Sequence, residues 1–278
     1  MILPMHYEDV ILRGLKEDIN YLDVTTDNLI PEEQESDAFF LIKNAGVLCG
    51  MEIALRTLKF LDAGITVEIL KNDGEQVENQ DIAARVHGRT RALLKGERTA
   101  LNLLQHLSGI ATAAAQAVQL VKGTKAKICD TRKTLPGLRV LEKYAVTVGG
   151  AQNHRFNLSD AALIKDNHID AAGGIEQAVS LLRSRIGHTV KIEVETRDLK
   201  ELKQALKANA DIIMLDNMSP VEMEKAVKMV AGKVPLEASG GITMENLRAV
   251  AETGVDMISI GALTHSVRAL DISMKIKM

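Results

Sequence analysis

The chain has 278 residues, of which 46% are hydrophobic and 26% are charged, so it can bury one large core or two moderate ones. A net charge of -3 argues against a protein that binds nucleic acid or membrane over its whole surface, so any recognition of anions has to be local. With three Tyr, four Phe and no Trp, the chain has too few aromatic side chains for a surface that stacks bases. We therefore expect no nucleic-acid partner.

Cysteine usage and the N-terminal sequence indicate the compartment. Cys49 and Cys129 lie far apart and outside any C-x-x-C pattern, which favours a reducing compartment, no metal framework and two small core residues. Glu8 and Asp9 precede any apolar segment, so we expect no signal peptide. No uninterrupted apolar run approaches the roughly 18 residues of a membrane span. These features predict a cytoplasmic protein with no membrane partner.

The first third of the chain mixes helices and strands. Apolar residues at helical spacing predict helices over 8–19 and 50–62. The segment 38–50 predicts two short strands about a turn, and the segment 65–77 predicts a hairpin at its Asn-Asp-Gly sequence. This order is typical of an α+β unit.

The pattern changes near residue 108, and from about residue 125 short β-branched strands alternate with helical stretches. Such alternation predicts βαβ units and a parallel sheet. Seven strands are predicted, at 126–130, 144–150, 161–166, 190–195, 210–216, 235–241 and 255–261. They favour an open, incomplete TIM-like α/β barrel, with an open doubly wound sheet as the alternative.

Polar or small residues end almost every predicted strand. In a barrel of this kind the catalytic groups lie where the strands end, at the carboxyl face. The strand ends of this chain carry Arg132, Lys133, Lys165, Asp166, Asn167, Glu193, Glu195, Asp216, Asn217, Ser239, Gly240, Gly241 and Gly261. We therefore expect an active site at this face of the sheet.

Two glycine-containing strand ends, "EASGGI" and "ISIGAL", indicate a phosphate site. The amides that follow Ser239 and Gly261 can donate to phosphate oxygens, and a helix over 243–250 would add the attraction of its positive end. In TIM barrels the loops after the last two strands often hold phosphate. The alternative is that these glycines only serve tight strand-to-helix turns.

Basic residues at the strand ends suggest that two anionic groups are bound. Arginine suits bidentate carboxylate recognition, whereas lysine suits neutralisation of a pyrophosphate. The basic cluster consists of Arg132, Lys133, His154, Arg155 and Lys165. One carboxylate group and one phosphate group are therefore expected.

Two acids and two further cations allow more than one interpretation. Glu195 and Asp216 could hold a Mg²⁺ ion with phosphate and water, stabilise a developing cation, or form strand-end salt bridges with a neighbouring lysine. Arg139 and Lys143 fall in a helix-like segment and are expected to be solvated.

Seven segments then carry motifs in a recognisable order: "ERTALNLLQHLSGIAT", "DTRKTLPGLRVLEKYAVTVGG", "NHRFNLSDAALIKDNHI", "IEVET", "IIMLDNM", "LEASGGIT" and "ISIGALTHSVRALDISMKI". From about Asp23 to the C-terminus the chain resembles the quinolinate phosphoribosyltransferase family, also called carboxylating nicotinate-nucleotide pyrophosphorylases. The resemblance implies a pentosyltransferase that joins quinolinate to phosphoribosyl pyrophosphate with Mg²⁺. Its products would be nicotinate mononucleotide, pyrophosphate and CO₂, in NAD biosynthesis.

The resemblance also implies a division into domains. An N-terminal α+β sandwich domain would occupy 1–107, joined by the C-terminal tail at about 268–278. An open α/β barrel of about seven parallel strands would occupy 108–267 and catalyse the reaction.

The same resemblance implies roles for individual residues. The positions that hold the quinolinate carboxylates match Arg132, His154 and Arg155. The catalytic lysines between the two substrates match Lys133 and Lys165, and the acids near the ribose hydroxyls and Mg²⁺ match Glu195 and Asp216. The phosphate loops match Ser239, Gly240, Gly241 and Gly261, with His265 nearby. The arginine that a neighbouring subunit contributes across an interface matches Arg98, which implies a homodimer or a dimer-based hexamer.

Three other functions fit part of the pattern. A Schiff-base aldolase would use Lys165, but that function does not explain the presence of Arg132, His154 and Arg155. A molybdenum-transport-associated relative shares "TRKT", "PG" and "HR" motifs, although the intact "NHR" and "LIKDNH" favour the quinolinate enzyme. A non-catalytic nucleotide-binding protein would keep only the phosphate loops.

The remaining histidines are interpreted as structural. His87, His106 and His188 show no metal-ligand spacing. His168 in "KDNH" favours a structural role, with a catalytic one left open.

Overall fold

The computed structural model describes residues 2–277, and the chain forms two compact units. The first unit contains the residues up to 115, the segment 134–150 and the residues from 266 onward. The second unit contains the segments 116–133 and 151–265. The segment 134–150, which a division at 107/108 assigns to the barrel, is thus part of the first unit.

The first unit combines helices with an antiparallel sheet. Its helices are η1 (Pro4–His6), α1 (Glu8–Asp18), α2 (Thr26–Leu29), α3 (Met51–Leu61), α4 (Thr90–Leu120, whose last turn belongs to the second unit) and α5 (Arg139–Val148). Its strands are β1 (Glu35–Ile42), β2 (Gly46–Val47), β3 (Thr66–Ile69), β4 (Gln76–Val77), β5 (Ile82–Arg89) and β12 (Ile272–Lys277). The helices predicted over 8–19 and 50–62 are confirmed as α1 and α3.

One face of the first unit's main sheet is buried beneath helices α3 and α4. The strand order is β12-β1-β5-β3, with antiparallel neighbours throughout. Ala38, Phe40 and Ile42 alternate along β1 and share one buried cluster with Leu58 of α3 and Leu101 of α4. The buried face of the strand, with every second residue apolar, therefore packs against the apolar faces of the two helices in a single core.

The local pairing predicted for the segment 65–77 is wrong. Its two strands, β3 and β4, do not pair with each other, because β3 pairs with β5 and β4 pairs with β2. The Asp73 side chain instead accepts hydrogen bonds from the backbone N–H groups of Gly50 and Met51, where α3 begins. The turn sequence thus serves to cap a helix. The two strands predicted within 38–50 are present as β1 and β2.

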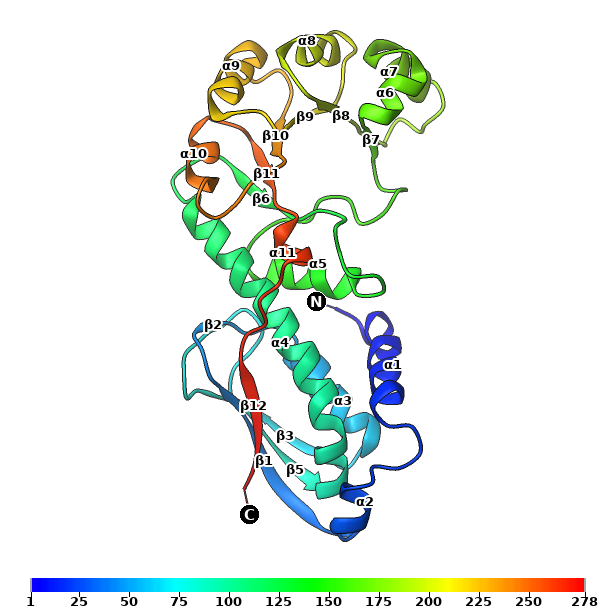
Figure 1. Cartoon of the computed structure of the whole chain (residues 1–278), viewed down its shortest axis with the longest axis vertical. Helices are drawn as coiled ribbons and strands as arrows, with labels where there is room; N and C mark the ends of the chain where they lie inside the picture. The colour runs from blue at the N-terminus through cyan, green and yellow to red at the C-terminus, as the bar shows by residue number, and fades with distance from the viewer. Residues whose placement is uncertain (1, 278) are drawn as a thin grey trace. The chain divides into compact units, whose positions relative to one another are not determined.

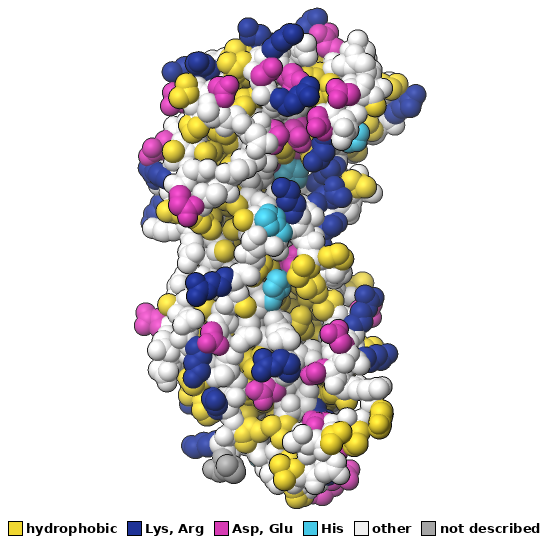
Figure 2. All heavy atoms as spheres, in the orientation of Figure 1, with side chains coloured by type: hydrophobic (Ala, Val, Ile, Leu, Met, Phe, Trp, Pro, Cys, Tyr) yellow, Lys and Arg dark blue, Asp and Glu magenta, His cyan; other side chains and the backbone are white. Residues whose placement is uncertain are grey.

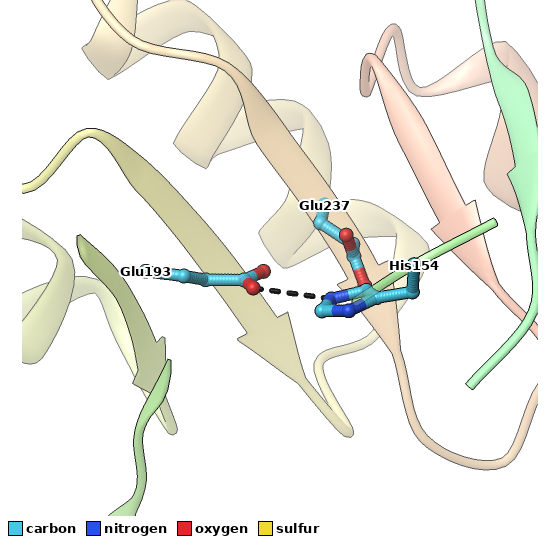
Figure 3. Close-up of side chains that lie close together, drawn as sticks. All are labelled: His154, Glu193 and Glu237. Atoms are coloured by element: carbon cyan, nitrogen blue, oxygen red, sulfur yellow. Dashed lines mark ion pairs between the residues drawn. The ribbon is translucent and has the colours of Figure 1, made fainter. Parts of the chain in front are cut away.

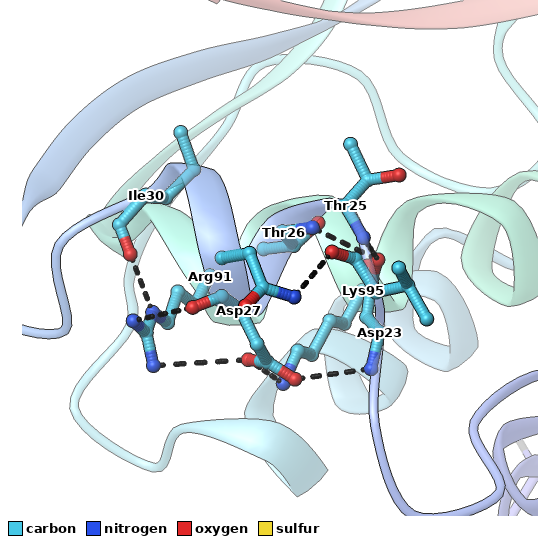
Figure 4. A network of polar contacts seen from close by, with 9 residues as sticks. Asp23, Thr25, Thr26, Asp27, Ile30, Arg91 and Lys95 are labelled. Carbon is cyan, nitrogen blue, oxygen red and sulfur yellow. Dashed lines mark hydrogen bonds and ion pairs between the residues drawn. The ribbon is translucent and has the colours of Figure 1, made fainter.

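A polar network fastens the short helix α2 to α4 (Figure 4). Asp23 accepts a hydrogen bond from the Thr26 N–H group at 2.9 Å and donates its own N–H group to Asp27 Oδ2 at 3.0 Å. Lys95 Nζ lies 2.5 Å from Asp27 Oδ1, and Arg91 donates to the Asp27 carbonyl. Lys95 is the main reason why the pKa of Asp27 lies below its usual value.

The second unit is built on a curved parallel sheet of six strands. The strands are β6 (Lys127–Cys129), β7 (Ala162–Ile164), β8 (Ile192–Thr196), β9 (Ile212–Asp216), β10 (Leu236–Ser239) and β11 (Met257–Ser259), in the order β6-β11-β10-β9-β8-β7. The helices are α6 (Asp166–Ala172), α7 (Ile175–Arg183), α8 (Leu199–Lys207), α9 (Pro220–Val230), α10 (Leu247–Glu252) and α11 (Ala262–His265). Helices α7 to α10 lie on the outer side of the curve (Figure 1). Among the described strands, β6 and β7 do not pair, so the barrel is open.

One of the seven predicted strands, at 144–150, is wrong. These residues largely belong to helix α5, in which Leu141, Ala145 and Val146 are buried. Leu141 and Ala145 lie one helical turn apart and share a face, so the burial of that face overrides the β-branched character of "VTV". The open sheet therefore has six parallel strands in place of about seven.

Across residues 2–277, no helix is both long enough and apolar enough to cross a membrane. Cys49 and Cys129 are both buried, as expected, and neither forms a disulfide.

Candidate active site

The strand ends of the second unit surround a cavity of about 680 Å³. All of its lining residues belong to this unit. On the face shown in Figure 2, basic and acidic side chains lie next to one another within the curve of the sheet. The lining includes twelve of the residues predicted from the sequence: Arg132, Lys133, His154, Arg155, Lys165, Glu195, Asp216, Ser239, Gly240, Gly241, Gly261 and His265.

Alternation along the strands explains how the sequence fills this cavity. In five strands, two residues that are two positions apart face the inside of the curve, because side chains of a strand alternate between its faces. The pairs are Leu163 and Lys165, Glu193 and Glu195, Met214 and Asp216, Glu237 and Ser239, and Ser259 and Gly261. The second member of each pair lies at the strand end or just beyond it.

Lys165, Glu195 and Asp216 form one electrostatic group. Lys165 Nζ lies 3.7 Å from Glu195 Oε2, so the lysine salt bridge weighed for Glu195 is present. Burial raises the pKa of Glu195, Lys165 opposes this rise, and Asp216 adds to it. The two acids are close enough for a bound cation to relieve their repulsion.

Two glycine-containing loops present backbone donors to the same cavity. Gly240 and Gly241 adopt positive φ angles of 86° and 61°. Within residues 2–277, the N–H groups of Gly240, Gly241, Gly261 and Ala262 donate to no protein acceptor. Amides of this kind are suited to phosphate oxygens.

The helix predicted over 243–250 begins later than expected. Helix α10 starts at Leu247, after a turn in which Asn246 Oδ1 accepts from the Thr243 N–H group at 2.9 Å. Its positive end therefore does not follow Gly241 directly. The attraction for anions at this loop comes from its own amides.

Gly261 allows Lys133 to pass close to the backbone. A β-carbon at Gly261 would lie 2.8 Å from Lys133 Cδ and 3.1 Å from His265 Cδ2. The carbonyl oxygen of Lys133 accepts from the Thr264 hydroxyl at 2.8 Å. Among the described residues, the Lys133 ammonium group has no hydrogen-bonding or ionic partner. It is thus available to an anion in the cavity.

Arg155 is fixed by its neighbours in the chain. Its Nη1 donates to the Ala161 carbonyl at 2.9 Å, and its N–H group donates to His154 Nδ1 at 2.8 Å. Burial lowers the pKa of Arg155 from its ordinary value, and the positive charge of Arg132 lowers it further. Two mutually repelling guanidinium groups at one cavity wall favour an anion between them.

Both ring nitrogens of His154 have polar contacts, and Figure 3 shows the two glutamates, Glu193 and Glu237, that lie near the ring. Nε2 lies 3.1 Å from Glu193 Oε2 and 3.5 Å from Glu237 Oε1, while Nδ1 accepts from the Arg155 N–H group. The His154 N–H group donates to the buried Asp130 carboxylate at 2.7 Å. A direct contact between this ring and a substrate carboxylate would require one of the ring contacts to be replaced.

The glutamates behind His154 are almost fully buried, with Glu193 4% and Glu237 2% exposed. Burial raises the pKa of Glu237 to about 7, the nearby charge of Glu193 adds to the rise, and His154 opposes it. Near neutral pH this group therefore gains and loses a proton.

The structure does not bring Arg98 to this cavity. Arg98 lies on α4 in the first unit and lines a second cavity of about 400 Å³, which consists of first-unit residues only, including Arg13 and Gly137. The role predicted for Arg98 depends on a second subunit and stays a prediction.

Several other predicted residues have clear positions. Lys143 is buried, so the expectation that it is solvated is wrong. His106 pairs with buried Glu142 at 2.9 Å, and exposed His87 pairs with Asp37 at 2.9 Å, in agreement with structural roles. His168 Nδ1 accepts from the Lys165 N–H group at 3.1 Å and so stabilises the start of α6.

The sequence placed Glu193 and Asn217 at strand ends without a specific role, and it did not single out Glu237. Glu237 lies two positions before Ser239, so strand alternation was the signal that could have found it. Asn217 follows β9 directly and lines the cavity. Its positive φ angle is not visible in a sequence.

Fold and cavity together define a class of protein: an open α/β-barrel enzyme with basic and acidic side chains around a cavity at its strand ends, where enzymes of this fold bind their substrates. The chain belongs to the quinolinate phosphoribosyl transferase family. The N-terminal domain of that family matches residues 23–108, and its C-terminal domain matches residues 110–275. The predicted family and fold class are thereby confirmed.

Individual relatives match over nearly their whole length. The chain is 45% identical over 262 residues to a protein of Bacillus subtilis named as a probable carboxylating nicotinate-nucleotide pyrophosphorylase, a match that covers 94% of this chain and 90% of the relative. It is 43% identical over 272 residues to the carboxylating nicotinate-nucleotide pyrophosphorylase of Mycobacterium leprae, covering 96% and 95%. The crystal structure of NadC from Streptococcus pyogenes matches with a TM-score of 0.96 at 39% identity, covering 100% of this chain and 98% of that one.

Proposed function

We propose that this protein is a quinolinate phosphoribosyltransferase. It converts quinolinate and phosphoribosyl pyrophosphate into nicotinate mononucleotide, pyrophosphate and CO₂, in the biosynthesis of NAD. The observation that carries the proposal is that twelve family-motif residues line one cavity. It is supported by the relatives at 45% and 43% identity, which are named as a probable carboxylating nicotinate-nucleotide pyrophosphorylase and as a carboxylating nicotinate-nucleotide pyrophosphorylase.

The charges of the cavity suit these two substrates. Burial and then the positive charge of Arg132 lower the pKa of Arg155, and a dicarboxylate bound between the two guanidinium groups would relieve that repulsion. The Lys133 ammonium group and the loop amides at Gly240 and Gly261 suit the phosphate groups. We assign Arg132, His154 and Arg155 to the quinolinate side and Lys133, Lys165, His265 and both glycine loops to the phosphoribosyl side.

Glu195 and Asp216 would hold Mg²⁺ together with substrate oxygens and water. The fit rests on their donor set, because Mg²⁺ prefers carboxylate oxygens and commonly binds through one or two carboxylates plus substrate phosphates. It also rests on the charge of Asp216, which adds to the rise that burial causes in the pKa of Glu195. When bound, the ion supplies charge neutralisation for the pyrophosphate leaving group.

The residues of this chain orient the substrates and stabilise charge. The pyridine nitrogen of quinolinate bonds to C1 of the ribose as the bond between C1 and the pyrophosphate oxygen breaks, and pyrophosphate leaves with that electron pair. Carboxylates of Glu195 and Asp216 favour the positive charge that develops on the ribose ring. Lys133 and Lys165 neutralise the departing phosphates, and the fixed guanidinium groups hold the ring in line.

Loss of CO₂ follows from the charge on the alkylated ring. The bond to the carboxylate next to the ring nitrogen breaks, and its electron pair is stabilised by the cationic nitrogen. The ring carbon then takes a proton from water. The protein's part in this step is to hold the ring while the carboxylate leaves.

We also propose that the active enzyme is a homodimer, or a hexamer built from dimers, in which Arg98 of one subunit completes the quinolinate site of its neighbour. Arg98 lines a cavity of the first unit together with Arg13, Glu17 and Asp18, so its proposed role rests on its match to the family motif and not on the net charge of that cavity. We further propose a cytoplasmic location, because two buried cysteines without a disulfide suit a reducing compartment.

The test is an assay of purified protein with quinolinate, phosphoribosyl pyrophosphate and Mg²⁺. We expect nicotinate mononucleotide to form only when all three are present. Formation without Mg²⁺ would reject the metal proposal alone. No product from folded protein with all three would reject the function.

A further inference from the structure

Asn217 occupies a backbone conformation that is unusual for a residue with a side chain. It follows β9 directly and has a φ angle of +54°. Glycine adopts this left-handed region freely, whereas other residues meet a steric cost, although asparagine tolerates it better than most. A left-handed asparagine at the wall of a cavity suggests that its side chain has a function there.

The Asn217 side chain lies between two parts of the cavity. Its Nδ2 atom donates to Asp216 Oδ2 at 2.8 Å. Its Oδ1 atom lies so close to Gly240 that a β-carbon there would come within 2.3 Å of it. The backbone N–H group of Asn217 donates to the Ser239 carbonyl at 2.9 Å. One residue thus connects the end of β9 to the loop after β10.

The two connected parts bind the same substrate in the function proposed above, on which this inference rests. Asp216 would face the ribose and Mg²⁺, and the amides of Gly240 and Gly241 would face phosphate. A carboxylate that accepts one fixed hydrogen bond keeps fewer orientations, and a loop pressed against a side chain keeps fewer conformations. Both effects lower the entropy that substrate binding must remove.

We propose that Asn217 is a positioning residue that fixes the Asp216 carboxylate and the Gly240 loop in one arrangement, and thereby sets the affinity for phosphoribosyl pyrophosphate. Quinolinate binding depends on other elements, so it does not depend on this side chain.

Asn217→Gly removes the side chain and keeps the backbone conformation, so the protein is expected to fold normally. We expect the KM and the calorimetric Kd for phosphoribosyl pyrophosphate to rise roughly tenfold to a hundredfold, the range for a lost hydrogen bond to a charged group. The KM for quinolinate should change by less than about twofold, within the noise of surface substitutions.

Asn209→Gly is the matched control. Asn209 also has a positive φ angle, 56°, but is exposed and lies outside the cavity. It therefore reports the effect of placing glycine in this conformation. We expect both substrate affinities of this variant to equal those of the unchanged protein.

A double substitution tests the contact with Gly240. In the unchanged background Gly240→Ala meets the Asn217 amide, whereas in the Asn217→Gly background that obstacle is gone. The loss of affinity caused by Gly240→Ala should therefore be smaller in the second background.

The inference is overturned if Asn217→Gly binds phosphoribosyl pyrophosphate as tightly as the unchanged protein, or weakens both substrates equally. Turnover by the unchanged protein reports separately on the proposed function. If that turnover is absent, calorimetric binding of phosphoribosyl pyrophosphate with Mg²⁺ still decides the inference, and equal binding by the unchanged protein and Asn217→Gly, including no binding by either, counts against it.

Discussion

Gly261 lies against the aliphatic part of Lys133, where an added β-carbon would come within 2.8 Å of Lys133 Cδ. Its own φ angle is outside the left-handed region, so alanine fits the backbone. The flexible lysine would have to move, which changes binding more than stability. We expect Gly261→Ala to raise the KM for phosphoribosyl pyrophosphate about tenfold, as for one weakened charge-assisted contact.

Gly187→Ala is the matched control for this measurement. Gly187 has no atom within 4 Å of the added carbon and no positive φ angle. Steady-state kinetics of both variants decide the point, and an unchanged KM in Gly261→Ala would contradict the role given to Lys133.

Lys165 is expected to act on the transition state. Its ammonium group lies 3.7 Å from Glu195 and faces the cavity. Lys165→Met should lower kcat/KM by a factor on the order of 10² to 10³, typical of losing one preorganised electrostatic contact. Lys125→Met is the control, because Lys125 pairs with Asp256 outside the cavity. Near-normal kcat/KM in Lys165→Met would remove this residue from the site.

Glu237 predicts a pH dependence of stability. Burial raises the pKa of Glu237 from 4.5 to about 7, so the folded state binds this proton more tightly than the unfolded state does. The resulting stabilisation is fully present below pH 4.5 and is lost as the pH rises to about 7. Glu237→Gln cannot titrate and therefore does not lose this stabilisation. The free energy of unfolding of the variant, relative to that of the unchanged protein, should rise as the pH increases across this window.

Urea unfolding at several pH values measures this difference. Exposed Glu224, changed to Gln, serves as the control and should show no comparable trend. A difference between Glu237→Gln and the unchanged protein that stays constant with pH would contradict the prediction.

At the scale of elements, helix α5 is a segment in which tertiary packing overrides the local preference of the sequence for a strand. The valines and threonine of "YAVTVGG" favour a strand, but the buried face of α5 contains Leu141, Glu142 and Ala145 at helical spacing. Six strands were predictable because each β-branched run has polar ends and a helical stretch after it. The absence of a hairpin between β3 and β4 was not predictable, because Asp73 binds the start of α3, more than 20 residues earlier in the chain, and no local rule covers that contact.

Glu142 fastens α5 to two other segments of the first unit. Its carboxylate lies 2.9 Å from His106 Nε2 and accepts from the Leu135 N–H group at 3.1 Å. Because Glu142 is fully buried, Glu142→Ala leaves both partners without it and should lower the free energy of unfolding by about 3 kcal/mol.

Circular dichroism during urea unfolding measures that loss. Glu142→Gln keeps an acceptor in place and should cost clearly less. Equal stability of the alanine variant and the unchanged protein would show that this buried contact does not hold α5.

At the scale of the whole molecule, topology made the site predictable. Parallel strands end at one edge, so residues that are far apart in sequence, such as Arg132 and Gly261, could be expected in one cavity before any distance was known. Contacts that depend on how far each side chain reaches were not predictable. Glu193 and Glu237 meet His154 from two different strands, and only the folded sheet sets that distance.

Mixing two inactive variants tests the shared site. Arg98→Ala and Lys165→Ala should each be inactive, because each lacks one component of every site. In a mixed dimer one site regains both residues, so random exchange of subunits should restore about one quarter of full activity. No recovery after verified exchange would place Arg98 outside the neighbouring site.

The central claim is that this cavity joins a pyridine dicarboxylate to a phosphoribosyl group and releases one carboxylate. The most direct measurement uses quinolinate labelled in the carboxylate next to the nitrogen, and follows labelled CO₂ and nicotinate mononucleotide together, with nicotinate as a parallel acceptor. We predict one CO₂ for each nicotinate mononucleotide and no product from nicotinate. Product from nicotinate at a similar rate, or nicotinate mononucleotide without labelled CO₂, would contradict the account.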